Sequence, residues 1–163
     1  MTKDPIQTAL RMIPYGFYAI SSRAGDDTNV MVLNWFSQVS FEPRLVMIGL
    51  SKTAHSYGLI REGGAFVVNV FHRESAEALK PFTKSRAKNP DKMAAARFTP
   101  SATLGLPVLE GAAAYLECRV RQFVDVGADH DVVVAEVIGA GVMSEHDPAE
   151  TLTLPDLGWS YAG

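Results

Sequence analysis

The sequence predicts a mainly β protein in which about six antiparallel strands close into a small barrel with peripheral helices. Most of its apolar segments have the length of a strand, and short turns connect them. Strands that return through tight turns pair antiparallel, and closing them into a barrel removes the exposed edges of an open sheet. Stretches of helical character follow the third and the fourth strand.

The first predicted elements are a short helix and a hairpin. Asp4 can cap a helix that holds Pro5 at its first position, apolar residues recur at helical spacing, and Pro14 ends it. Residues 15–21 are predicted to form a strand, and the Gly- and Asp-rich residues 25–29 a hairpin turn.

Polar side chains interrupt the next apolar stretch, residues 30–41, which is predicted to form a single strand. The interruptions are Asn34, Ser37 and Gln38. Such groups cost free energy when they are buried without partners, so their presence needs a reason. Residues 44–50 are apolar on both alternating faces, which is typical of a strand covered on both sides.

A helix and a strand are predicted to come next. Ser51 or Thr53 can cap the helix, Gly63 and Gly64 can end it, and residues 65–71 form the strand.

The remaining chain is predicted to contain helical turns and then two more strands. Residues 74–98 indicate two short helices joined by a basic, polar loop. Residues 116–121 alternate, with Cys118 on the apolar face and Glu117 on the exposed one, as in a half-exposed antiparallel strand. Residues 132–138 form the last strand. This region is either a solvated face or a lid over an anionic ligand, and its basic residues are Lys80, Lys84, Arg86, Lys88 and Lys92.

Composition and charge exclude several classes of protein. The 15 Lys+Arg and 18 Asp+Glu residues give a net charge of −3 with no basic stripe, so no nucleic-acid binding is expected. No apolar run approaches the ~20 residues of a membrane helix, and the first residues lack the apolar core of a signal peptide, so a cytoplasmic protein is expected. Residues 1–163 are expected to form one domain. The single cysteine, Cys118, excludes a disulfide within the chain and is predicted to be a small buried hydrophobe.

Signatures of several enzyme classes are absent from the sequence. It contains no G-x-S-x-G, no P-loop and no G-x-G-x-x-G after a strand, which lowers the case for a hydrolase, a P-loop enzyme or a Rossmann enzyme. The four histidines do not pair at a spacing that predicts a metal site. His130 lies between Asp129 and Asp131, where it is either a solvated turn residue or, if protonated, a contact for an anionic ligand.

Two polar segments are candidates for a binding site. In VLNWFSQVSFEP, Asn34 and the backbone either face water at a bulge or hydrogen-bond the polar edge of a flat heterocycle that Trp35 or Phe36 covers. In SKTAHS, the hydroxyls, Lys52 and His55 either cap a helix or hold a phosphate at its start.

Taken together, these segments resemble the flavin reductase-like family, which has the FMN-binding split-barrel fold. The resemblance rests on three fragments in order, VLNWFSQVSFEPRLVMIGLSKTAHSYGLIREGGAFVVNVF, FTPSATLGLPVLEGAAAYLECRV and GADHDVVVAEV. It covers nearly the whole chain and implies a closed six-stranded antiparallel Greek-key barrel, the split barrel of that family.

The resemblance also implies the roles of individual residues. The flavin ring would contact the strand end at Val32, Leu33, Asn34 and Trp35, with backbone amides as far as Ser37 facing its pyrimidine edge. The FMN phosphate would be held by Ser51, Lys52, His55 and Ser56. His130 would be the catalytic residue, near the flavin or the nicotinamide. Many members have Thr or Ser where this chain has Val32 and Trp35, which makes the predicted ring contacts more apolar here.

The function that this resemblance implies is that of an FMN-binding, NAD(P)H-dependent flavin reductase. FAD or riboflavin could be the flavin substrate, and NADH or NADPH would be the reductant. A flavin-dependent monooxygenase is a candidate partner, and a homodimer is the expected assembly. One alternative is a flavoprotein that carries electrons between protein partners without using nicotinamide. Another is a small barrel that binds a different phosphorylated ligand.

Overall fold

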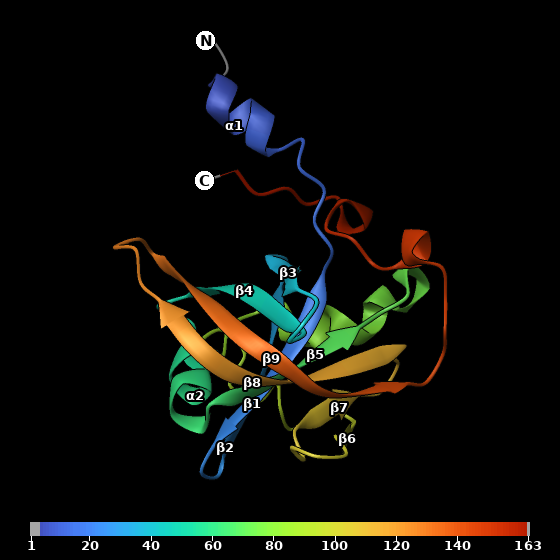
Figure 1. Cartoon of the computed structure of the whole chain (residues 1–163). Helices are drawn as coiled ribbons and strands as arrows, with labels where there is room; N and C mark the ends of the chain where they lie inside the picture. The colour runs from blue at the N-terminus through green and yellow to red at the C-terminus, as the bar shows by residue number, and fades with distance from the viewer. Residues whose placement is uncertain (1–3, 163) are drawn as a thin grey trace.

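Seven strands of the chain form one antiparallel sheet that curls around a core (Figure 1). The computed structural model describes residues 4–162, so both ends of the predicted domain 1–163 lie outside the described residues. In chain order the elements are α1 (Pro5–Leu10), β1 (Tyr18–Ala24), β2 (Asp27–Leu33), β3 (Phe36–Ser40), β4 (Leu45–Ser51), α2 (His55–Gly63), β5 (Ala65–Val70), the 3₁₀ helix η1 (Arg73–Phe82), β6 (Phe98–Pro100), β7 (Pro107–Leu109), β8 (Ala114–Val124), β9 (His130–Val142), and the short 3₁₀ turns η2 (Pro148–Glu150) and η3 (Pro155–Leu157).

The two edge strands of the sheet are neighbours in the sequence. The strand order is β2-β1-β5-β8-β9-β4-β3, and β6 and β7 form a separate pair. Only Asn34 and Trp35 lie between the end of β2 and the start of β3. Three residue steps reach at most about 10 Å, so the sheet has to curl until its two edges lie close together.

The buried side chains form two clusters on opposite faces of the curled sheet. One cluster joins Leu33 of edge strand β2 to Ile48 of β4 near the other edge, which shows that the inner face closes over a common core. The other cluster holds Phe71, Leu79 and Leu152, which lie at the end of β5, in η1 and in the C-terminal segment. Neighbouring residues of β1 face different clusters, so this strand is covered on both sides.

Helix α1 stands away from the sheet, as Figure 1 shows. Asp4 caps it as predicted, because its carboxylate accepts a hydrogen bond from the backbone N–H of Ile6 at 3.0 Å. No residue of α1 is buried, and Ile6 is 70% exposed. The C-terminal segment passes beside the start of the fold, where the N–H of Phe17 donates to the carbonyl of Leu152. No described helix has the length and apolar character needed to cross a membrane.

The predicted fold class is correct at the level of a mainly β, antiparallel protein, but closure into a six-stranded barrel is not confirmed. The main sheet has seven strands, and its pairings leave β2 and β3 as open edges. The additional strand arises because residues 30–41 are not one strand. The chain breaks at Asn34 and Trp35, where the first polar interruption falls.

Two local predictions around the helices were wrong. Neither Ser51 nor Thr53 caps α2, whose N-cap is Ala54 with no side-chain hydrogen bond, although Gly64 ends the helix in the left-handed conformation as predicted (φ 69°). Residues 74–98 contain one 3₁₀ helix, η1, and turns in place of the second helix. Pro81 and Pro90 interrupt this segment, so a regular helix cannot continue through it.

Strand β8 differs from its prediction at one residue. Cys118 is fully buried as predicted, and burial raises the pKa of its thiol to about 12. Glu117 was expected to face water but is 1% exposed. Its carboxylate accepts hydrogen bonds from the backbone N–H groups of Thr103 and Leu104, at 2.9 and 2.7 Å. The loop before β7 therefore covers a face that the alternating pattern alone assigns to solvent.

Candidate functional site

Two adjoining pockets on either side of the end of β2 contain most of the predicted site residues. The ring pocket, of about 230 Å³, is lined by Met31, Val32, Leu33, Asn34, Trp35, Gly49, Ser51, His130 and Tyr161. The cation pocket, of about 550 Å³, shares Met31 and Val32 with it and also includes Asn29, residues 53–56 and much of the basic loop, with Phe82, Lys84, Arg86 and Lys92 among its lining residues.

Trp35 forms the aromatic wall of the ring pocket. Its indole lies edge-to-face with the imidazole of His130, at a centroid distance of 4.9 Å, and with the ring of Tyr15 at 6.5 Å. It packs directly over Gly49, where an added Cβ would lie 3.0 Å from Trp35 Cε3. A glycine at this position of β4 therefore provides the space that the indole occupies.

Asn34 supplies a polar group that the described residues do not satisfy. Its amide nitrogen is buried, and no hydrogen-bond acceptor for it exists within residues 4–162. Leaving such a donor unpaired costs about 1–3 kcal/mol. A ligand with an acceptor on its edge would remove this cost.

His130 is held in the ring pocket by its neighbours in sequence and in the sheet. It pairs with Ser51 across β9 and β4, so both side chains reach the same pocket. Its Nδ1 hydrogen-bonds Asp129 Oδ1 at 2.8 Å, and this contact lowers the pKa of Asp129. Because Asp129 engages Nδ1, Nε2 is the ring nitrogen left for a ligand.

The carboxylate of Asp27 holds a guanidinium and an imidazole at the cation pocket. Arg86 donates to Asp27 at 2.8 Å, and His55 Nε2 hydrogen-bonds the other oxygen of Asp27 at 2.7 Å. The hydrogen bond from Arg86 is the main reason that the pKa of Asp27 is lowered. Arg86 also donates to the carbonyl of Thr28 at 3.2 Å, which fixes the guanidinium against the start of β2.

Lys92 is a buried cation in the same pocket. It is 3% exposed, and its ammonium donates to the carbonyl of Lys84 at 3.3 Å. No carboxylate lies within ion-pair distance of it in the described part of the chain, and burial, with the charge of Arg86, lowers its pKa. A buried charge without a counter-ion is costly, so this arrangement favours an anionic ligand.

The polar groups around Lys92 are consistent with an anion. Ala54, His55 and Ser56 at the start of α2 line the pocket, and no side chain caps this helix end. The free N–H groups of such a helix start attract anions. Ser56 is buried and accepts a hydrogen bond from the amide of Asn29 at 2.9 Å.

Two predicted site residues lie outside both pockets. Ser37 is exposed in β3 and donates to the carbonyl of Gln38. Lys52 forms an ion pair with Asp125 at 2.8 Å. Its predicted role as a phosphate ligand stays a prediction, as do the roles of the residues that line the pockets. Among the described residues, no group of three or more His, Cys, Asp or Glu side chains is arranged to hold a metal.

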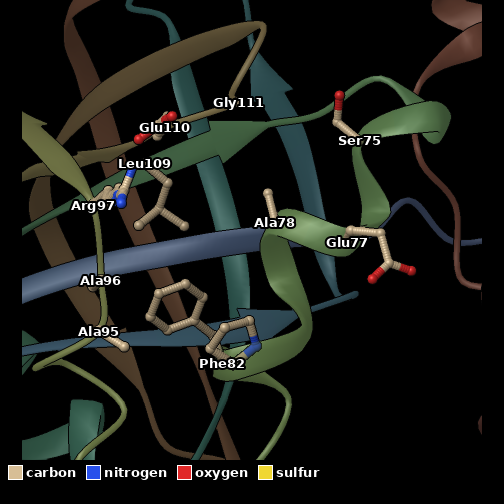
Figure 2. Close-up of a pocket in the computed structure, with 11 residues that line it drawn as sticks. Ser75, Glu77, Ala78, Phe82, Ala95, Ala96, Arg97, Leu109, Glu110 and Gly111 are labelled. Carbon is tan, nitrogen blue, oxygen red and sulfur yellow. The ribbon is translucent and has the colours of Figure 1, made fainter.

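A third hollow, of about 410 Å³, lies on the other side of Phe82 (Figure 2). Figure 2 shows Ala78 and Phe82 of η1 across from Leu109. None of the buried, unpaired polar atoms found in residues 4–162 belongs to its lining. It therefore lacks the unmet polar groups that distinguish the ring and cation pockets.

Comparison with known proteins identifies the family of this chain. The model of the flavin reductase like domain matches residues 10–158, which include both pockets except Tyr161. The chain belongs to the flavin reductase-like family. The resemblance inferred from the three sequence fragments is thereby confirmed.

The chain is similar to proteins of different lengths. A putative diflavin flavoprotein of Nostoc is 32% identical over 86% of this chain, which spans only 24% of that protein. An NADPH-flavin oxidoreductase of Streptomyces viridifaciens is 30% identical over 78% of this chain and 66% of its own. The solved structure of an NADH:FAD oxidoreductase of Streptomyces globisporus is 25% identical, with a TM-score of 0.76 over 88% of this chain and 87% of the other.

Sequence reasoning singled out the basic loop but not its buried residue, and it missed Asp27 and Tyr161. The basic loop was visible as a concentration of Lys and Arg in an acidic chain, but nothing distinguished Lys92, which is buried, from Lys88, which is exposed. Asp27 gave no signal, because an aspartate in a hairpin turn is commonplace. Tyr161 reaches the ring pocket from the C-terminal segment, and only the folded chain brings these two parts together.

Proposed function

We propose that the protein binds a flavin across the two pockets and reduces it with a nicotinamide nucleotide. The flavin ring would occupy the ring pocket and the phosphate of FMN the cation pocket. The observation that carries the proposal is the pairing of an aromatic pocket holding an unpaired amide donor with an adjoining pocket holding a buried, uncompensated cation. Membership of the flavin reductase-like family supports it.

Each pocket supplies a different part of flavin recognition. In the ring pocket, Trp35 and His130 offer flat surfaces, and the Asn34 amide can donate to an acceptor on the ring edge. In the cation pocket, Lys92, Arg86 and the start of α2 can hold the phosphate through charge-assisted hydrogen bonds. The bound flavin would supply the hydride chemistry, and the protein the orientation and the donors.

Stopped-flow mixing of the flavin-loaded protein with NADH and with NADPH tests the proposal. We expect at least one nucleotide to bleach the flavin absorption band. The names of two family members support the use of either nucleotide, because one uses NADPH and the other NADH. If neither nucleotide reduces a flavin that is demonstrably bound, the reductase proposal is wrong.

An electron carrier is the second candidate function. It is favoured by the similarity to diflavin flavoproteins, in which a domain of this kind makes up about a quarter of a longer chain. Under this proposal the bound flavin would be reduced rapidly by a reductase partner and not by NAD(P)H. The same stopped-flow experiment, with a reductase added in a second syringe, separates the two functions.

A homodimer that passes reduced flavin to a flavin-dependent monooxygenase is a further proposal. The exposed apolar side chains of α1, Ile6 and Leu10, support a second copy as the element that covers them. Light scattering coupled to size exclusion measures the assembly. A monomer at micromolar concentration would contradict this part of the proposal.

A further inference from the structure

A polar cluster lies behind the strand that carries His130. Lys52 forms an ion pair with Asp125 at 2.8 Å and lies 3.7 Å from Asp131. Tyr57 of α2 donates to the other oxygen of Asp131 at 2.6 Å, and Arg61 in turn donates to the Tyr57 hydroxyl at 3.3 Å. These residues connect the end of β4, helix α2 and the turn between β8 and β9. We name them the clamp cluster.

The alternation of side chains places the clamp cluster on the opposite side from the ring pocket. Ser51 and His130 are paired across β4 and β9, and both line the ring pocket. The next residues, Lys52 and Asp131, are absent from its lining and approach each other instead. Consecutive residues of extended chain point to opposite faces, so Ser51 and Lys52 do not present side chains to one ligand.

Lys52 holds the turn between β8 and β9 at two points. Its ammonium binds Asp125 at the beginning of the turn, and its backbone N–H donates to the carbonyl of Asp129 at 3.0 Å, at the end. Asp125 also accepts from the N–H of Gly127 at 2.8 Å, which fixes the middle. The residue that follows Asp129 is His130.

The nearby Asp131 makes the ammonium of Lys52 more important than the cation of an ordinary exposed ion pair. An exposed pair contributes about 0–1 kcal/mol. Asp131, however, is 1% exposed, and its Oδ1 has no hydrogen-bond partner within residues 4–162. Lys52 is the cation beside that oxygen. Without it, a buried carboxylate directly after His130 would lack a counter-charge, and the strand would have to shift to reach water.

We infer that Lys52 is a positioning residue that holds the turn between β8 and β9 so that His130 faces the ring pocket. The inference rests on the proposed function, because the effect is measured on flavin reduction. It assigns Lys52 a role away from the FMN phosphate. Lys52 acts through Asp125 and Asp131, and not by contact with a ligand.

The variant Lys52→Met removes the charge and keeps most of the side-chain length. We expect flavin reduction by the nicotinamide nucleotide to slow about fivefold to tenfold, while the dissociation constants of FMN and riboflavin change by the same factor. Hydrogen exchange of residues 125–131 in the free protein should become faster. Lys52→Arg should restore both quantities. The matched control is Lys80→Met, since Lys80 also pairs with a carboxylate at 2.7 Å but lies on η1, away from both pockets.

The outcomes separate this inference from its alternatives. A loss of FMN affinity with unchanged riboflavin affinity would make Lys52 a phosphate ligand and overturn the inference. Unchanged exchange in residues 125–131 would also overturn it. If the wild-type flavin is not reduced by either nucleotide, the proposed function fails, but the exchange measurement still decides the inference. Asp125→Asn, on the exposed side of the same pair, gives the same test if Lys52→Met does not fold.

Discussion

At the scale of single residues, the charge of Lys92 should lower the stability of the free protein but raise its affinity for FMN. It is a buried cation whose only described hydrogen-bond partner is a carbonyl. Lys92→Met would remove a desolvated charge and keep the volume, so the melting temperature of the free protein should stay equal or rise. The affinity for FMN should fall by about 10- to 100-fold, because a charge-assisted hydrogen bond is lost, with little change for riboflavin. Fluorescence titration measures both affinities, and the exposed Lys88→Met is the control.

The pH dependence of FMN binding follows from the lowered pKa of Lys92. Burial first, and then the charge of Arg86, lowers this pKa below that of an exposed lysine. A bound phosphate favours the charged ammonium, so the affinity for FMN should be full below the pKa of Lys92 and fall as the pH rises through it. In Lys92→Met this alkaline decrease should be absent. An unchanged decrease in the variant would assign it to another group.

Gly49 offers a test of the ring pocket that is independent of the phosphate. An alanine Cβ there would lie 3.0 Å from Trp35 Cε3, so the indole would be pushed from its place toward the pocket. Gly49→Ala should therefore weaken FMN and riboflavin by a similar factor, about tenfold. A loss restricted to FMN would show that Trp35 does not border the ring. The same titration as for Lys92 measures the effect.

At the scale of elements, Glu117 fixes the loop 101–106 on strand β8. Glu117→Gln keeps the shape but weakens the hydrogen bonds from the N–H groups of Thr103 and Leu104. The free energy of unfolding should fall by about 1–3 kcal/mol, since these bonds end on a buried charge. Urea unfolding at neutral pH measures the loss. An exposed carboxylate, Glu145, provides the control substitution to Gln.

The stabilising effect of Glu117 should depend on pH. Burial by itself raises its pKa, but hydrogen bonds from Leu104, Ser101 and Thr103 outweigh burial, and the pKa is lowered. The stabilisation is therefore present above the ordinary glutamate pKa of about 4.3 and is lost as the pH falls through the lowered value. The difference in unfolding free energy between wild type and Glu117→Gln should shrink over that acidic range. A difference that stays constant would mean that the carboxylate is not ionised in the folded protein.

Periodicity predicted the elements well where burial follows the strand pattern and less well where loops cover a surface. Residues 65–71 and the capped helix at Asp4 were predicted correctly, because their burial and capping are local. The break at Asn34 and Trp35 was not, since an apolar run contains no information on where the chain changes sheet position. Glu117 was assigned to solvent because the residues around it alternate. The loop that contains Thr103 covers it, and a strand pattern does not report such contacts.

The candidate site was predictable in outline for a similar reason. Asn34 was singled out as a polar residue in an apolar run and His130 through the family resemblance, and the structure brings both to one pocket. Ser51 was expected at the phosphate, but it lines this ring pocket and not the cation pocket. Lys52 looked equivalent to Ser51 in the sequence, but its side chain lies on the other side of the chain. The direction of a side chain just beyond the end of a strand depends on the contacts that the chain makes there. The sequence alone does not contain these contacts.

At the scale of the whole molecule, helix α1 contributes little to the stability of the fold. None of its residues is buried, and none belongs to either core cluster. Deleting residues 1–13 should change the melting temperature of the monomer by less than about 2 °C, whereas a dimer in which a second copy covers α1 should lose more. Ending the chain at Asp147 should lower it strongly, because Leu152 and Leu154 are 0% and 1% exposed and losing a buried leucine costs about 2–5 kcal/mol. Thermal unfolding followed by circular dichroism compares the two. A large loss on removal of α1 would mean that it packs against another part of the assembly.

The closeness of the two sheet edges has a consequence for how the molecule opens. Strands β8 and β9 lie in the middle of the sheet, whereas β3 pairs with only one neighbour and exposes Ser37, Gln38 and Val39. Local unfolding starts where few contacts must be broken, so fluctuations should begin along the seam between β2 and β3. The ring pocket lies at the end of that seam, where Asn34 and Trp35 join the two strands. Ligand entry and the first step of unfolding would therefore share one motion, and a bound ligand would slow both.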